Sequence, residues 1–167
     1  MADFQRGTVV GIHIAPGAEQ ETHAVETANV VAGRGIEGDR YFRADGDGTF
    51  YEPGKDGQDL TLIEAEAIEG LAADTGIELA AGEARRNVVT RGVALNDLVG
   101  RRFTVGEVEA VGDRLCDPCS HLQKLTQPGV LKGLADRGGL RADVVRGGAI
   151  RVGDELRELG PARERQL

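Results

Sequence analysis

Glycine constrains the architecture of this chain more than any other residue type. Its 25 glycines are spread along 167 residues and separate short runs rich in β-branched side chains, whereas aromatic residues make up only 4%. Such frequent breaks favour many turns between short strands. Strands are therefore expected at Thr8–Ile14, Val25–Ala32, Leu60–Ile63 and Ala84–Arg91.

Two similar segments strengthen the case for a β fold. Residues 100–107 (GRRFTVGE) and 147–154 (GGAIRVGD) both end in glycine and an acid, and each leads into a further apolar run. Each segment thus predicts a hairpin. Repeated hairpins on a glycine-rich chain favour a closed barrel, because closure leaves few exposed strand edges. We predict a mainly β fold, a closed β-barrel with a few flanking helices.

The longest helix is expected at Glu64–Thr75. Its apolar positions recur with helical spacing, and Gly76 suits a C-terminal cap. Shorter helices are expected to start near Ser120 and at Val130–Asp136. The length fits a single domain spanning residues 1–167, with a core at about 7–158 and a frayed tail at 160–167.

Charge and hydropathy exclude several classes of protein. The net charge is −8, from 28 acidic and 20 basic residues, which argues against a nucleic-acid-binding surface. No apolar run approaches the roughly 18 residues that span a bilayer. The first seven residues do not resemble a signal peptide. The chain is therefore expected to be cytoplasmic, with neither nucleic acid nor membrane as a partner.

The expected reactive centre is the segment Leu115–Leu122, which holds both cysteines and one of the three histidines. Four interpretations of the cysteine pair stay open. They are a structural zinc site, which would need further ligands at suitable spacing, a thioredoxin-like dithiol, a pair of small buried side chains, and a single thiolate that binds a soft metal or carries sulfur.

Arginines near predicted turns form a second group of candidate site residues. Arg34 and Arg40 flank a glycine-containing turn, and Arg85 and Arg86 directly precede Asn87. Guanidinium groups bind phosphate with two hydrogen bonds, so an anion site is one interpretation. The alternative is that these arginines pair with surface acids. Residues 33–58 form a long glycine-rich loop that is either functional or disordered.

Short motifs that follow one another along the chain point to a family. They are GIEGDRY (35–41), QDLTLIE (58–64), RNVVTRG (86–92), LVGRRFTVG (98–106) and CDPCSHL (116–122). Their order and approximate spacing resemble the MOSC domain, named for the C-terminal domain of molybdenum cofactor sulfurases. The chain departs from the family pattern at Tyr41, where histidine is frequent, and at Arg86, where an acid commonly precedes the asparagine.

The resemblance implies a MOSC-like barrel that binds molybdenum cofactor (molybdopterin), which recombinant material is expected to lack. It implies that Cys119 is the catalytic residue and the molybdenum ligand. The cofactor-binding residues would be Asp39, Arg40, Arg86, Asn87 and His121, with Arg40 and Arg86 in the same cleft as Cys119.

The activity implied by the resemblance is the reduction of N-hydroxylated small molecules, with electrons from a separate electron-transfer protein. One alternative is a non-enzymatic sulfur carrier or cofactor-binding module that holds a Cys119 persulfide supplied by a desulfurase. Another is a redox protein based on a Cys116–Cys119 dithiol.

Overall fold

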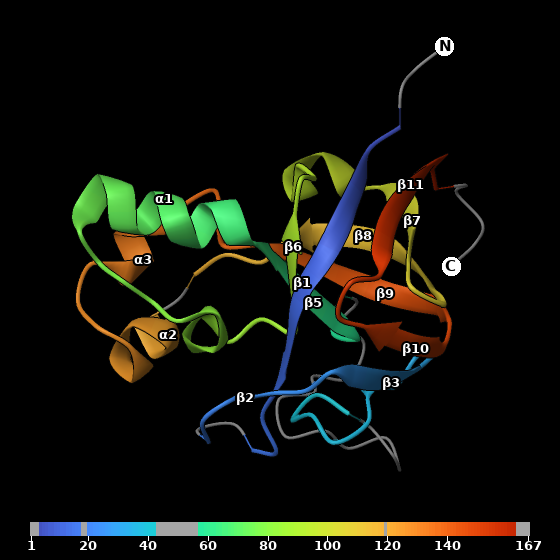
Figure 1. Cartoon of the computed structure of the whole chain (residues 1–167), viewed down its shortest axis with the longest axis horizontal. Helices are drawn as coiled ribbons and strands as arrows, with labels where there is room; N and C mark the ends of the chain where they lie inside the picture. Colours follow the sequence, from blue (N-terminus) through green and yellow to red (C-terminus); the bar gives the residue numbers. More distant parts are fainter. Residues whose placement is uncertain (1–3, 18–19, 43–56, 119, 163–167) are drawn as a thin grey trace.

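The computed structural model describes residues 4–17, 20–42, 57–118 and 120–162, and the side chains of 120 and 121 are not described. Among these residues, seven strands close into a β-barrel, which confirms the predicted fold class (Figure 1). Around the barrel the strands are β1 (Arg6–Ile14), β11 (Glu155–Pro161), β7 (Arg101–Val105), β8 (Val108–Leu115), β9 (Leu140–Arg146), β5 (Leu60–Glu64) and β6 (Val88–Arg91).

Closure is made by β1, which pairs with β6 on one side and with β11 on the other. Neighbouring barrel strands are antiparallel except β5 and β6, which run parallel with Leu62 opposite Val88. A parallel pair needs a crossover connection. Helix α1 (Ala65–Thr75) and the 3₁₀ turn η1 (Ala81–Ala84) supply it.

The barrel interior is filled mainly by aliphatic side chains. Phe103, Leu62, Leu140 and Ile12 are fully buried there. Alternate residues of β8 point inward from Val108 to Gly112, as expected for a strand with one buried face. A scarcity of aromatic residues is therefore compatible with a continuous core.

A small second sheet lies beside the barrel. It joins β10 (Gly148–Arg151), β3 (Thr27–Val31) and β4 (Gly35–Ile36), while β2 (His23–Ala24) pairs with the end of β1. The strand expected at Val25–Ala32 is thus β3, and it begins two residues later.

The hairpin predicted for the second repeat is wrong. Its two strands, β10 and β11, are joined by the expected turn, where Gly153 has a φ of 96°. However, β10 pairs with β3, whereas β11 pairs with β7 and β1. The turn therefore carries the chain from the small sheet into the barrel wall.

The helices gather on one side of the barrel (Figure 1). Helix α1 lies where it was predicted, and Gly76 caps it with a φ of 77° and a hydrogen bond from its N–H to the carbonyl of Ala72. Helix α3 (Val130–Gly133) packs against both α1 and α2 (Ser120–Leu125). Their shared core holds Leu71, Leu79, Leu122, Val130 and Leu134.

Two predicted strand boundaries need correction, and one strand was not predicted at all. The strand expected from residue 84 begins only at Val88, because residues 81–84 form η1 and Arg85 adopts a left-handed φ of 61°. Strand β9 was not predicted. Gly160 and Pro161, assigned to a frayed tail, pair with β7 as part of β11, while residues 163–167 lie outside the described part of the chain.

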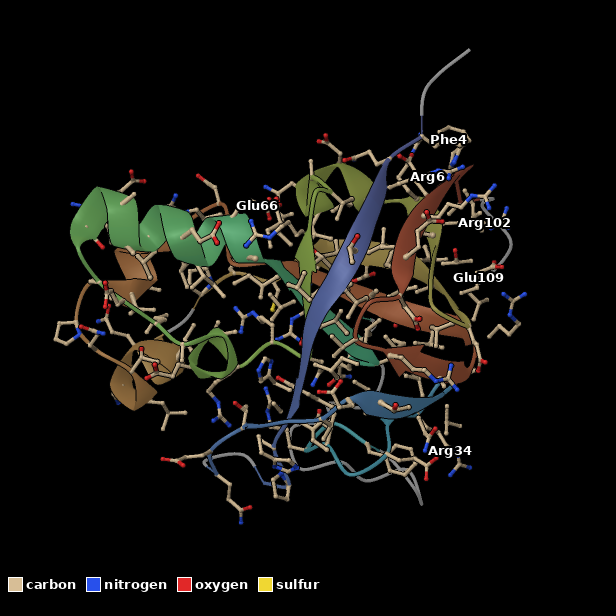
Figure 2. All side chains as sticks on the ribbon, viewed as in Figure 1. Phe4, Arg6, Arg34, Glu66, Arg102 and Glu109 are labelled. Atoms are coloured by element: carbon tan, nitrogen blue, oxygen red, sulfur yellow. The ribbon has the colours of Figure 1, made fainter. Side chains whose placement is uncertain are left out.

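Some arginines outside the candidate site pair with acids near the surface. Arg102 on β7 donates to Glu109 on β8 at 3.3 Å, and Figure 2 shows both on the side of the barrel away from α1. Such partly exposed pairs contribute at most about 1 kcal/mol. Within the described residues, no helix is long and apolar enough to cross a membrane.

Candidate functional site

The cysteine segment leaves the barrel at the end of β8. Cys116 is 1% exposed, and its N–H donates to the carbonyl of Gly139 at 2.7 Å. Helix α2 begins at Ser120, as the sequence favoured. Cys119 itself and the side chain of His121 lie outside the described residues, so their predicted roles stay predictions.

Arg86 holds the backbone of this segment in place. Its Nε donates to the carbonyl of Gly138 at 2.8 Å, and its Nη2 donates to the carbonyls of Cys116 and Asp117 at 3.2 and 3.3 Å. The residue is only 8% exposed. Hydrogen bonds from a charged donor are the stronger kind, so Arg86 fixes the path of the chain immediately before Cys119.

Asn87 connects three strands of the barrel. Its Oδ1 accepts from the N–H and hydroxyl of Thr61 at 3.3 and 3.1 Å, and its Nδ2 donates to the carbonyl of His13 at 3.2 Å. The backbone N–H and carbonyl of Asn87 also bond to Thr61 and His13. At 1% exposure, Asn87 acts here as a structural link between β5, β6 and β1.

Asp39 and Arg40 form a buried ion pair at the edge of the same network. Arg40 Nη1 lies 3.0 Å from Asp39 Oδ1, and that oxygen also accepts from the N–H of Ala15 at 3.0 Å. Arg40 Nη2 donates to the carbonyl of Arg85 at 2.7 Å. The Nε of Arg40 is buried and has no hydrogen-bond partner among the residues that the structure describes. Asp39 therefore orients Arg40 but leaves one of its donors unsatisfied.

Three guanidinium groups are buried in this region, because Arg40, Arg85 and Arg86 are each at most 9% exposed. Burial lowers the pKa of Arg85, and the nearby charge of Arg40 lowers it further. Positive charges are thus held close enough to disfavour one another. An anionic group beside them would relieve that repulsion.

A further cation lies close to this group. The guanidinium of Arg141 lies 5.8 Å from the ring of Tyr41, and that of Arg40 lies 4.9 Å from the same ring. In the antiparallel pairing of β8 with β9, Arg141 lies opposite a second cation, Arg114. The chain therefore gathers cations near the cysteine segment although its net charge is −8.

The sequence-based site residues fall into two groups. The structure joins Asp39, Arg40 and Asn87 through contacts with the end of β1 and with Arg85, and it brings Arg86 to the cysteine segment. Thr61, which fixes Asn87, was not identified from the sequence. It sits inside a β-branched strand run, where a threonine carries no distinguishing signal.

Comparison with known proteins gives a family and a fold. The family model described as MOSC domain matches residues 52–157. A search of curated proteins finds no match. Among solved structures, the YuaD protein from Bacillus subtilis is similar with a TM-score of 0.78 and 18% identity, covering 98% of this chain and 100% of that one.

Two further solved structures support the same fold. YiiM from Geobacillus stearothermophilus is similar with a TM-score of 0.68 and 17% identity, covering 92% of this chain and 75% of its own. YiiM from Escherichia coli gives 0.64 and 16%, with coverage of 98% and 73%. The family match spans more than half of the sequence, and the protein belongs to the MOSC domain family.

Proposed function

We propose that this protein binds molybdenum cofactor and reduces N-hydroxylated small molecules, with the Cys119 thiolate as the metal ligand. The observation that carries the proposal is the buried group of Arg40, Arg85 and Arg86, in which Arg86 contacts the backbone of the cysteine segment. Thiolate is a ligand suited to soft metal centres. Electrons would come from a separate electron-transfer protein.

The residues present fit a cofactor that carries a phosphate. The Nε of Arg40 is buried and has no hydrogen-bond partner among the described residues, and the charge of Arg40 lies close enough to Arg85 to lower the pKa of that guanidinium, an effect second to burial. Arg40 and Arg85 would hold the phosphate end. When bound, the cofactor would supply the centre at which electrons reach the N–O bond.

The other residues of the site would act on the protein itself. Arg86 would keep Cys119 at a fixed position by holding the carbonyls of Cys116 and Asp117. Asp39 would orient Arg40, and Asn87 would keep the ends of three strands together. None of these contacts requires the cofactor, so the site would be preorganised before binding.

The burial of Cys116 bears on the dithiol alternative. A dithiol of this spacing uses its first cysteine as the attacking thiolate, and that thiol must be accessible. Cys116 is 1% exposed. This disfavours a dithiol mechanism and leaves the sulfur carrier as the principal alternative.

The test is metal and pterin analysis of protein from a host that makes the cofactor, combined with assays on an N-hydroxylated compound and a chemical reductant. We expect bound molybdenum, turnover, and loss of both in Cys119→Ser. A persulfide on Cys119 without bound metal or turnover would replace this proposal with the sulfur carrier.

A further inference from the structure

A groove beside β1 adjoins the site described above and shares only Arg85 with it. It consists of two hollows that share His13 and Ala24, which we call the His13 groove. The polar hollow, of about 440 Å³, lies between β1, η1 and the end of α2, and is lined by Thr22, Glu83, Arg85 and Leu125, among others. The other, of about 420 Å³, is more apolar and is lined in part by Val10, Val25 and Ile68.

His13 lines both hollows. None of the described residues forms a hydrogen bond with either ring nitrogen, and Nδ1 is buried. Burial lowers the pKa of His13, so the ring is neutral at neutral pH. A neutral imidazole carries one donor and one acceptor, and a ligand in the groove would give it a partner.

Two glycines hold the ring in position. A Cβ added at Gly82 would lie 3.0 Å from His13 Cδ2 and 2.7 Å from Thr22 Oγ1, and one at Gly11 would lie 3.2 Å from His13 Cε1. Thr22 is itself fixed, because its hydroxyl donates to the carbonyl of Gly82 at 2.6 Å. Backbone therefore packs closely around an imidazole that forms no hydrogen bond with the described part of the chain.

The groove is connected to the proposed cofactor site through backbone contacts. The backbone of His13 exchanges hydrogen bonds with Asn87, and Arg85 lines the polar hollow while its carbonyl accepts from Arg40. Helix α2, which starts directly after Cys119, ends in the same hollow at Leu125. A molecule in the groove would thus lie next to the elements that carry the proposed chemistry.

We propose that the His13 groove is the substrate-binding site of the protein, an inference that rests on the proposed function. Its ligand is a small molecule with a planar N-hydroxylated head and an apolar body. The head hydrogen-bonds to His13 and lies near Glu83 and Arg85 in the polar hollow. The body packs on Val10 and neighbouring side chains in the apolar hollow.

The test is binding of N-hydroxybenzamidine to the full chain, measured by calorimetry and by the shift of the His13 ring signals in NMR spectra. Loss of one hydrogen bond in His13→Ala should weaken binding about 10-fold. Gly82→Ala, which narrows the polar hollow, should also weaken it. His23→Ala is the matched control, because His23 is exposed on β2 and lines neither hollow; it should bind as the wild type does.

The outcomes separate this inference from the proposed function. Binding that depends on His13 but is never followed by turnover, even with bound molybdenum, supports the groove and refutes the reductase. Turnover with an unchanged KM in His13→Ala overturns the groove and leaves the reductase intact. Absence of binding, or equal binding by the wild type and His13→Ala, also overturns the groove.

Discussion

Replacing Arg86 with alanine tests whether this side chain holds the cysteine segment. The change removes three hydrogen bonds, to the carbonyls of Gly138, Cys116 and Asp117, from a side chain that is 8% exposed. The two carbonyls of the cysteine segment share one nitrogen, so their bonds are not independent. All three acceptors lose a charged donor at once.

The expected loss of stability follows from these contacts. A hydrogen bond with a charged partner contributes about 1.5–3 kcal/mol, so two independent donor groups give a loss of about 3–6 kcal/mol. That is a large part of the roughly 5–15 kcal/mol that stabilises a domain. With a urea m-value of about 2 kcal/mol/M, the unfolding midpoint should fall by about 2 M.

Urea unfolding measures this loss, and amide hydrogen exchange locates it. Exchange at the N–H of Cys116, which bonds to Gly139, should accelerate most. Arg91→Ala is the matched control, since Arg91 lies on β6 and pairs with an exposed Glu69; its midpoint should stay near that of the wild type. An Arg86→Ala protein with the wild-type midpoint and unchanged exchange at Cys116 would refute the assigned role.

Other residues give further predictions. Asn87→Ala should destabilise the fold by about 2–4 kcal/mol in urea unfolding, because the links between three strands are lost; a loss below that of an exposed polar-to-alanine change would contradict the structure. Burial raises the pKa of Glu64, so as pH rises this carboxyl ionises in the unfolded chain before it ionises in the folded protein. It therefore lowers the free energy of unfolding at pH values above the ordinary pKa of glutamate. Glu64→Gln should therefore gain stability relative to the wild type as pH rises above the ordinary pKa of glutamate, and unfolding curves with a pH-independent difference would argue against this. Cys116→Ser should keep most metal or sulfur loading while Cys119→Ser loses it, and elemental analysis of both variants would expose the reverse order.

Local sequence signals predicted much of the fold. Glycine-separated β-branched runs located β1, β5 and the β7–β8 hairpin, and Gly76 marked the end of α1. The errors concern strand partners. Nothing in residues 147–154 indicates that β10 leaves the barrel to pair with β3, because that choice depends on side chains more than 100 residues away.

The site shows the same division between local and distant information. Motifs identified Arg86 and Asn87 as site residues, but their contacts join positions 26 to 74 residues apart. Sequence therefore does not indicate that Arg86 binds backbone carbonyls or that Asn87 links strands. The sequence placed His13 in a predicted strand and gave no sign of a binding role. That its ring lacks a hydrogen-bond partner among the described residues is evident only once η1 and α2 are placed beside β1.

The measurement that tests the central claim most directly is the molybdenum and pterin content of the purified protein from a cofactor-competent host, compared with Arg40→Ala and Cys119→Ser. We predict stoichiometric molybdenum and pterin in the wild type. Cys119→Ser should lose the metal, and Arg40→Ala should lose pterin together with metal, because its guanidinium lies at the proposed phosphate position. Wild-type protein without molybdenum or pterin, or equal contents in all three proteins, would contradict the account.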